Sequence, residues 1–259
     1  KVLQPFNSEY ITAKTLHEIY DVLVLFKDGL ELDGIYNQGF NSHLDMFKYS
    51  LASPSSSLNQ YINIFQLMAQ DIRQIISEYF FDVFEMPLNI IIPQILAQRK
   101  VKIRDEEESR QLFQMESEKF LRDNLSSAFL IQELDNFITG TINTLRGLIE
   151  NYSNKFIENM LTYNPDFAFS FLSEKTEKVD NPVFLGAKAF TLKKLVSYGF
   201  PVPPGFVITT EAFRHKDTII GHPYMRQDFD RMIENNIRKI ELITGKKYGD
   251  PGNPLFFSV

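Results

Sequence analysis

The sequence has 259 residues, of which 44% are hydrophobic and 23% charged, so it is long enough for one large globular domain or two ordinary ones. Its net charge of −6 argues against a nucleic-acid-binding protein, because such proteins usually carry a basic domain or stripe. The absence of cysteine excludes disulfides and cysteine-ligated metal sites, and it is consistent with a cytoplasmic protein.

No stretch of the sequence has the pattern of a membrane or export segment. The longest apolar runs, such as Leu88–Pro93, are far shorter than the roughly 20 residues that cross a bilayer. Residues Lys1–Asn7 lack the charged-then-apolar plan of a signal peptide. We therefore expect no membrane partner. Because the chain begins with Lys1 and stops at Val259 directly after an apolar run, we also expect it to be a piece of a longer protein.

Residues 1–175 are predicted to be a helical domain, built as an antiparallel bundle of four to seven helices. A first helix over about Thr12–Lys27 should end at Asp28-Gly29, since glycine commonly stops helices. A second is predicted over residues 56–85, where apolar residues recur at alternating spacings of four and three. The residues of this stripe are Leu58, Ile62, Phe65, Ala69, Ile72, Ile76, Tyr79 and Val83.

The second half of this domain continues the helical pattern. Pro87 and Pro93 are expected to break or kink the chain after Glu85, because proline lacks the amide proton and its ring clashes with the preceding turn. A helix from about Asp105 to Asn124 opens with four acidic residues, which the helix dipole favours. Another is predicted over residues 128–157, with Ile138, Ile142, Leu145, Ile149, Tyr152 and Phe156 on its buried side.

Nothing in this helical domain indicates chemistry. His17 and His43 lie 26 residues apart without a metal-ligand pattern, so we interpret them as surface or capping residues and predict no metal site. The acidic run Asp105–Glu108 is read as a solvated helix start in preference to a cation site. The aromatic run Tyr79–Phe81 is assigned to the core, with a protein partner for the helical domain kept as the alternative.

Composition changes near residue 180. Residues 1–180 carry a net charge of −10 and residues 181–259 a net charge of +4. The last 79 residues also hold 7 of the 12 glycines and 7 of the 12 prolines. This shift places a domain boundary in the polar stretch Ser173–Asn181.

The second domain, residues 181–259, is predicted to be an α/β lobe. Residues 181–185 are expected to form a strand or extended lead-in, followed by a helix that Gly199 ends. A strand is predicted over Phe206–Thr209, a helix start at Thr210 and a helix over Asp228–Thr244, with a final strand over Leu255–Val259. His215 and His222 fall between these elements and are assigned to the surface.

The turn Gly186-Ala187-Lys188 is the one candidate binding feature. A small-residue turn that enters a helix presents backbone amides to an anion, and a lysine adds a positive charge. Taken alone the signal is weak, because glycine turns beside surface lysines are common.

Three ordered blocks of this lobe resemble the start of the ATP-binding domain of the pyruvate phosphate dikinase and phosphoenolpyruvate synthase family. Residues 186–192, GAKAFTL, are similar to its G-G-K-G-x-x-L opening, with Ala187 in place of the second glycine. Residues 199–212, GFPVPPGFVITTEA, resemble its G-L-P-V-P-P-G-F-x-I-T-T-E-A segment. Residues 244–255, TGKKYGDPGNPL, are similar to its T-G-K-x-F-G-D-P-x-N-P-L stretch.

The resemblance implies a grasp-type nucleotide-binding lobe that is truncated here. It implies that Lys188 and Gly186 contact ATP phosphates in a full-length parent, with Mg²⁺ as cofactor and a phosphohistidine domain of the same parent chain as acceptor. It assigns no catalytic residue to this chain, and neither ATP nor Mg²⁺ is expected to bind the fragment alone. The fragment itself is therefore expected to be inactive.

Three hypotheses remain open from the sequence. The first is a fragment of an ATP-dependent phosphotransferase whose final acceptor, pyruvate, glucan or another compound, is undetermined. The second is a helical interaction or regulatory module attached to a non-catalytic dikinase-like domain. The third is a natural truncated relative that keeps the fold without catalysis.

Overall fold

The computed structural model describes residues 10–53, 56–99 and 105–257. The chain is mainly helical, and the described residues contain one two-stranded sheet. Two compact units are present, and we call residues 17–147 the helical unit. We call the described residues of Lys1–Leu16 and Leu148–Val259 the mixed unit.

Six α-helices supply the helical unit. They are α1 (Ala13–Leu32), α2 (Gln38–Ala52), α3 (Leu58–Ile76), α4 (Val83–Gln98), α5 (Glu106–Ser127) and α6 (Phe129–Asn151), with a π-helical segment, Ser77–Asp82, between α3 and α4. Side-chain caps start several of them: Asn37 for α2, Ser57 for α3 and Asp105 for α5 each accept a hydrogen bond from an amide three residues on. The predicted acidic helix start at Asp105–Glu108 is thus a capped terminus.

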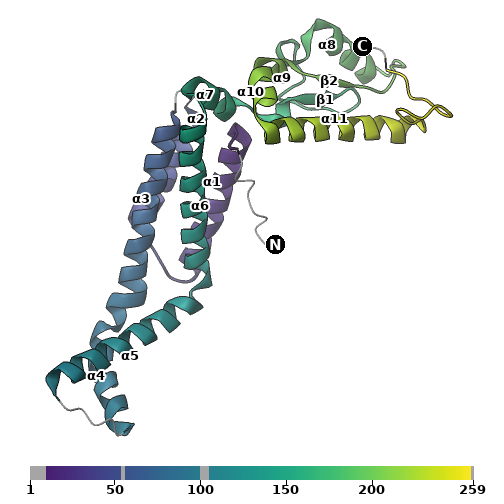
Figure 1. Ribbon diagram of the computed structural model, residues 1–259. Helices are drawn as coiled ribbons and strands as arrows, with labels where there is room; N and C mark the ends of the chain where they lie inside the picture. The colour runs from purple at the N-terminus through teal and green to yellow at the C-terminus, as the bar shows by residue number, and fades with distance from the viewer. Residues whose placement is uncertain (1–9, 54–55, 100–104, 258–259) are drawn as a thin grey trace. The chain divides into compact units, whose positions relative to one another are not determined.

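Phe47 of α2 is at the centre of the helical core. Its ring is fully buried and contacts Tyr20 of α1 and both Tyr61 and Phe65 of α3. Figure 1 shows α1, α3 and α6 running alongside one another. The stripe predicted for α3 faces this core, and Ile72 is completely buried, as is Leu145 of α6. The alternating spacing therefore identified only part of each buried face: Val83 and Ile149 of the predicted stripes are 59% and 40% exposed. The assignment of the aromatic run Tyr79–Phe81 to the core is wrong, since none of its residues is fully buried and Phe81 is exposed.

Two predicted helix ends are wrong. The first helix passes through Gly29 to Leu32, and a left-handed glycine, Gly34 at φ 78°, follows its end. At Gly29 a Cβ atom would lie 2.9 Å from a Leu130 methyl carbon, so this glycine permits close packing instead of stopping the helix. The helix predicted over 128–157 stops at Asn151, because Ser153 caps a new helix, α7 (Asn154–Thr162).

The prolines do not break the chain where expected. Helical structure runs without interruption from Leu58 to Gln98, and Pro87 and Pro93 both lie inside α4. Each proline removes one backbone hydrogen bond, but Leu88, Ile92 and Leu96 pack against apolar residues of α5 and hold the helix in place. By length and composition this long helix could cross a membrane, contrary to the expectation from the short apolar runs, and one such helix is weak evidence for a span.

The mixed unit contains a small sheet between helices. Its elements after α7 are a 3₁₀ turn (Pro165–Phe167), β1 (Phe169–Phe171), α8 (Pro182–Ser197), β2 (Phe206–Ile208), α9 (Thr210–Arg214), α10 (Lys216–Gly221) and α11 (Pro223–Thr244). The strands pair antiparallel, with Phe169 opposite Ile208 and Phe171 opposite Phe206. Figure 1 shows the sheet between α8 and α11. Phe171, Ile240 of α11 and Leu255 form a buried cluster on one side of it.

Several predictions for this unit need correction. Residues 181–185 are not extended: Asn181 caps the amides of Val183 and Phe184, and Pro182 begins α8, where its missing amide costs nothing. Residues 255–257 form no strand, and the rest of that predicted strand lies outside the described residues. The sheet also pairs β1, from before the composition boundary, with β2 after it. The strand over 206–208, the end of α8 before Gly199 and the end of α11 at Gly245 are confirmed.

Candidate functional site

Gly186 divides α8 into two pieces. Its φ of 71° and ψ of 164° lie in a region that is essentially restricted to glycine, and no neighbouring atom lies within 4 Å of the place where a Cβ would sit. A new helical run follows it, and the first amides of a helix have no acceptor within the helix itself. Ala187 and Lys188, both exposed, occupy the first turn of this run. The backbone geometry therefore explains why glycine stands at 186.

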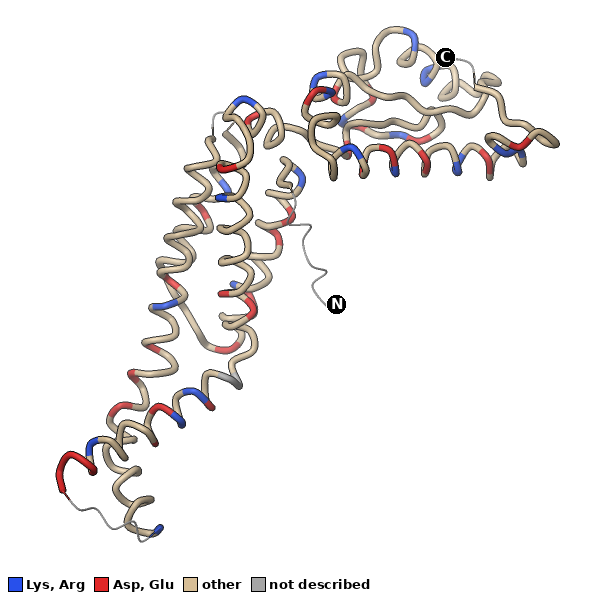
Figure 2. Tube along the Cα trace, viewed as in Figure 1, with Lys and Arg blue, Asp and Glu red and all other residues tan. Residues whose placement is uncertain are grey.

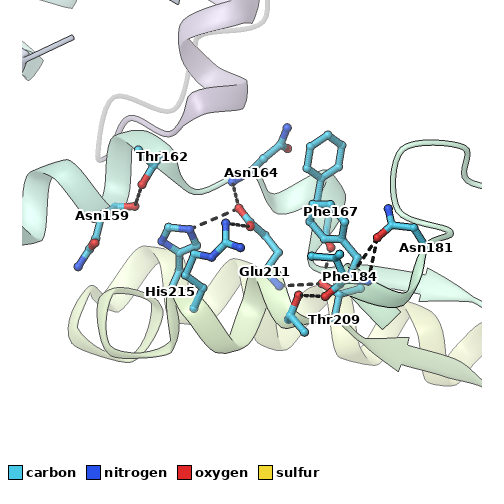
Figure 3. A network of polar contacts seen from close by, with 12 residues as sticks. Asn159, Thr162, Asn164, Phe167, Asn181, Phe184, Thr209, Glu211 and His215 are labelled. Atoms are coloured by element: carbon cyan, nitrogen blue, oxygen red, sulfur yellow. Dashed lines mark hydrogen bonds and ion pairs between the residues drawn. The ribbon is translucent and has the colours of Figure 1, made fainter. Parts of the chain in front are cut away.

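Hydrogen bonds on both sides fix the segment before this turn. The Asn181 side chain accepts hydrogen bonds from the amides of Val183, at 3.0 Å, and Phe184, at 3.2 Å. The hydroxyl of Thr210 donates to the Val183 carbonyl at 2.8 Å, which links the start of α9 to the start of α8. Figure 3 shows Asn181 and Phe184 beside Thr209.

Further along the same helix, a buried lysine anchors it to the sheet. Lys193 is 9% exposed, and its Nζ donates hydrogen bonds to the Asp180 carboxylate and to the Ser170 hydroxyl of β1. Burial on its own raises the pKa of Asp180, but hydrogen bonds from Lys193 and the Thr176 amide outweigh it, so the pKa is lowered. Asp180 is therefore a carboxylate at neutral pH and neutralises the buried lysine. Sequence reasoning missed this pair.

A second buried polar cluster surrounds Glu211 of α9 (Figure 3). Its Oε1 accepts a hydrogen bond from the Asn164 amide at 3.1 Å and lies 3.4 Å from Nε2 of His215. Burial raises the pKa of Glu211, yet the hydrogen bonds from His215 and the Asn164 amide lower it overall. Burial, followed by the charge of Glu211, raises the pKa of Tyr163. This cluster joins the end of α7 to α9.

The prediction that His215 and His222 lie on the surface is wrong. They are 3% and 2% exposed, respectively. His215 lies between α9 and α10 with Nε2 toward Glu211, and no partner for its Nδ1 is present among the described residues. His222 accepts from the Met225 amide at the start of α11, and its ring packs against Tyr10 and Tyr152. Aromatic neighbours that are distant in sequence cover it, which no local pattern indicates.

The other histidines do not form a metal site in the structure. His17 is exposed, while His43 is half-buried and its Nδ1 lies within hydrogen-bonding distance, 2.6 Å, of Oδ2 of Asp71. Across the described ranges, no three His, Asp or Glu side chains converge in an arrangement that could hold a metal ion.

Comparison with known proteins points to dikinases. No protein-family model matches the chain, and no solved structure matches it. The chain is 37% identical over 79 residues to a pyruvate, phosphate dikinase of Entamoeba histolytica, and 35% identical over 75 residues to that of Clostridium symbiosum. These matches span 30% and 29% of this chain but only 9% and 8% of the dikinases. They support a partial relationship to pyruvate phosphate dikinase.

Proposed function

We propose that this chain carries the opening part of the ATP-binding domain of an ATP-dependent dikinase, a phosphotransferase similar to pyruvate phosphate dikinase or phosphoenolpyruvate synthase. The observation that carries the proposal is Gly186. Its glycine-only backbone starts a helix with the exposed Lys188 in the first turn, and this is the geometry that phosphate binding at a helix N-terminus requires. The partial identity to dikinases supports the same assignment.

In this proposal Lys188 neutralises charge on the phosphoryl oxygens of ATP, and the amides that follow Gly186 donate hydrogen bonds to them. Mg²⁺, when bound in the full-length parent, would supply further positive charge to the phosphates. The phosphoryl group would then pass to a histidine of a separate phosphohistidine domain in the same parent chain. His215 and His222 do not take that role here, because both are buried.

The proposal also assigns a role to each of the two units. The helical unit corresponds to an antiparallel bundle, and the mixed unit to the first part of a grasp-type lobe whose remaining strands lie elsewhere in the parent. Asp180, Lys193 and Thr210 serve this lobe by holding both ends of the segment that contains Gly186.

The alternative is a helical interaction or regulatory module attached to a non-catalytic dikinase-like domain. Two observations favour it: the dikinase matches cover only about 30% of the chain, and Ala187 replaces the second glycine of the family turn. Under this alternative the Gly186 turn would keep its shape and bind no nucleotide.

An assay of the longer parent protein separates the two. The dikinase proposal predicts ATP-dependent formation of AMP together with an acid-labile phosphohistidine. The 259-residue chain alone should show neither, because its dikinase match spans less than a tenth of those enzymes. A parent that forms no AMP with any acceptor supports the alternative, and AMP formation by the isolated chain contradicts both.

A further inference from the structure

One exposed hydrogen bond connects the start of α9 to the first turn of α8. The hydroxyl of Thr210 donates to the carbonyl of Val183 at 2.8 Å, across 27 positions of the sequence. Val183 stands before Gly186, in the short piece of α8 that the Asn181 cap begins. The side chains of Thr210 and Val183 are both exposed, so packing between them does not account for the contact.

The break at Gly186 explains why the Val183 carbonyl takes a hydroxyl as its donor. In an unbroken helix this carbonyl would accept from the amide four residues on, which belongs to Ala187. Gly186 lies between the two with φ 71° and ψ 164°, outside the helical region, so the regular pattern is interrupted there. The Thr210 hydroxyl supplies a donor to the carbonyl, while the Ala187 amide begins a new run without its usual acceptor. Gly186 has no side chain with which to cap that run.

The neighbours of Thr210 on both sides are fixed in the interior of the mixed unit. Thr209 is 1% exposed, and its hydroxyl donates to the Phe167 carbonyl at 2.5 Å. Glu211 is 4% exposed, and its carboxylate accepts from the Asn164 amide at 3.1 Å. These two anchors restrict the backbone of Thr210, so its hydroxyl can hold the α8 carbonyl at a small cost in conformational entropy.

We propose that Thr210 is a positioning residue for the candidate phosphate turn, Gly186-Ala187-Lys188. By holding the Val183 carbonyl, it keeps the chain broken at Gly186 and leaves the amides that follow free to bind phosphate. The choice of phosphate as ligand rests on the proposed function. Figure 2 shows basic residues and no acidic residue on α8. A neutral hydroxyl holds the turn without adding negative charge beside Lys188, whereas a carboxylate would compete with the phosphate for the lysine.

Nuclear magnetic resonance of the 259-residue chain tests whether Thr210 holds the turn. Thr210→Val removes the hydroxyl and keeps the branched shape, so the amide resonances of Ala187 and Lys188 should shift. Thr210→Ser retains a hydroxyl and should restore both resonances to their unmodified positions. The melting temperature should hardly change in either variant, because one exposed hydrogen bond contributes little stability.

Thr144→Val is the matched control. The Thr144 hydroxyl donates to the Gly140 carbonyl of its own helix, α6, at 3.1 Å, and its loss should leave the resonances of Ala187 and Lys188 in place. Unmoved resonances in Thr210→Val, or a shift that Thr210→Ser does not reverse, overturn the proposal. A Thr210→Val chain that unfolds also overturns it, since the contact would then serve stability.

Kinetics in the longer dikinase proposed as the parent test the effect on phosphoryl transfer. Thr210→Val should lower turnover about threefold to tenfold, the size of one neutral hydrogen bond, with a smaller change in the KM for ATP. Because Thr210 acts through the turn that holds Lys188, adding Thr210→Val to Lys188→Ala should cause no further loss. Losses that multiply in the double variant overturn the positioning role. A parent that forms no AMP refutes the proposed function, whereas the resonances of Ala187 and Lys188 still decide whether Thr210 holds the turn.

Discussion

The Nζ of Lys193, in the middle of α8, donates a hydrogen bond to the carboxylate of Asp180, which directly precedes the Asn181 cap of the same helix. Ser170 of β1 accepts a second hydrogen bond from the same Nζ. These contacts tie the two ends of the segment that contains Gly186 to the sheet. The position of the candidate phosphate turn therefore depends on a buried ion pair that does not touch the proposed ligand.

Asp180→Asn is expected to lower the free energy of unfolding by about 3 kcal/mol at neutral pH, because the buried Lys193 then lacks its counter-charge. Chemical denaturation followed by circular dichroism measures this. Asp230→Asn is a matched control, since Asp230 is exposed on α11 and its nearest basic group, Arg226, is 4.0 Å away. Equal losses in the two variants would contradict the role assigned to Asp180.

Acid should lower the stability of the mixed unit, because the carboxylates of Asp180 and Glu211 become protonated. The folded-state pKa values of Asp180 and Glu211 lie below their ordinary values, so the unfolded chain binds protons first as the pH falls. Their stabilisation is complete above about pH 5 and is lost as the pH falls through the folded-state pKa values. The stability difference between the unmodified chain and Asp180→Asn should shrink over this range. A difference that stays constant down to pH 2 would show that Asp180 does not titrate as described.

Gly186→Ala should destabilise the chain by about 1–3 kcal/mol, because alanine strongly disfavours this backbone conformation. No atom crowds the site, so the cost is conformational. Gly140→Ala provides the contrast: Gly140 lies inside α6 with open space around it, and alanine there should stabilise by about 0.5–1 kcal/mol. The melting temperatures of the two variants should shift in opposite directions. A Gly186→Ala variant with the unmodified melting temperature would mean that the turn is not built as described.

Charged substitutions in the core of the helical unit should lower the free energy of unfolding severely. Ile72→Asp and Leu145→Asp each place an unpaired charge at a fully buried position, and a loss of about 3 kcal/mol or more is expected for each. Leu25→Asp, at a largely exposed position on α1, should change stability by less than about 0.5 kcal/mol. Retention of the unmodified melting temperature by both core variants would refute the shared core.

Local sequence patterns predicted most helices, but they did not predict the contacts between helices. Periodic apolar residues located α3, α6 and α11, because the buried face of an amphipathic helix recurs at helical spacing in the sequence. The acidic start at Asp105–Glu108 located α5. The predictions that failed concern residues whose role depends on contacts with other helices. Gly29 serves packing against Leu130, and Pro87 and Pro93 stay helical because α4 has a partner in α5.

In the candidate site, too, local features were predicted from the sequence and contacts between residues far apart in the sequence were not. The Gly186 turn was predicted from its residues, since glycine before a helix-like run is a local signal. The Lys193–Asp180 pair and the burial of His215 and His222 were not, because each depends on residues brought together by the β1–β2 sheet and the packing of α7, α9 and α10. Lys193 stands between Leu192 and Lys194, so no local pattern distinguishes it from the exposed lysine beside it.

Steady-state kinetics of Lys188→Ala in the longer dikinase that we propose as the parent of this chain tests the central claim most directly. Lys194→Ala is the matched control, an exposed lysine on the same helix whose Nζ lies over the Phe190 ring. If Lys188 holds the transferring phosphate, its removal lowers turnover about 100-fold or more, affinity for ATP falls less and the melting temperature hardly changes. Lys194→Ala should leave turnover near that of the unmodified parent. Equal turnover in the Lys188→Ala variant and the unmodified parent would contradict the phosphate-binding role and the dikinase proposal built on it.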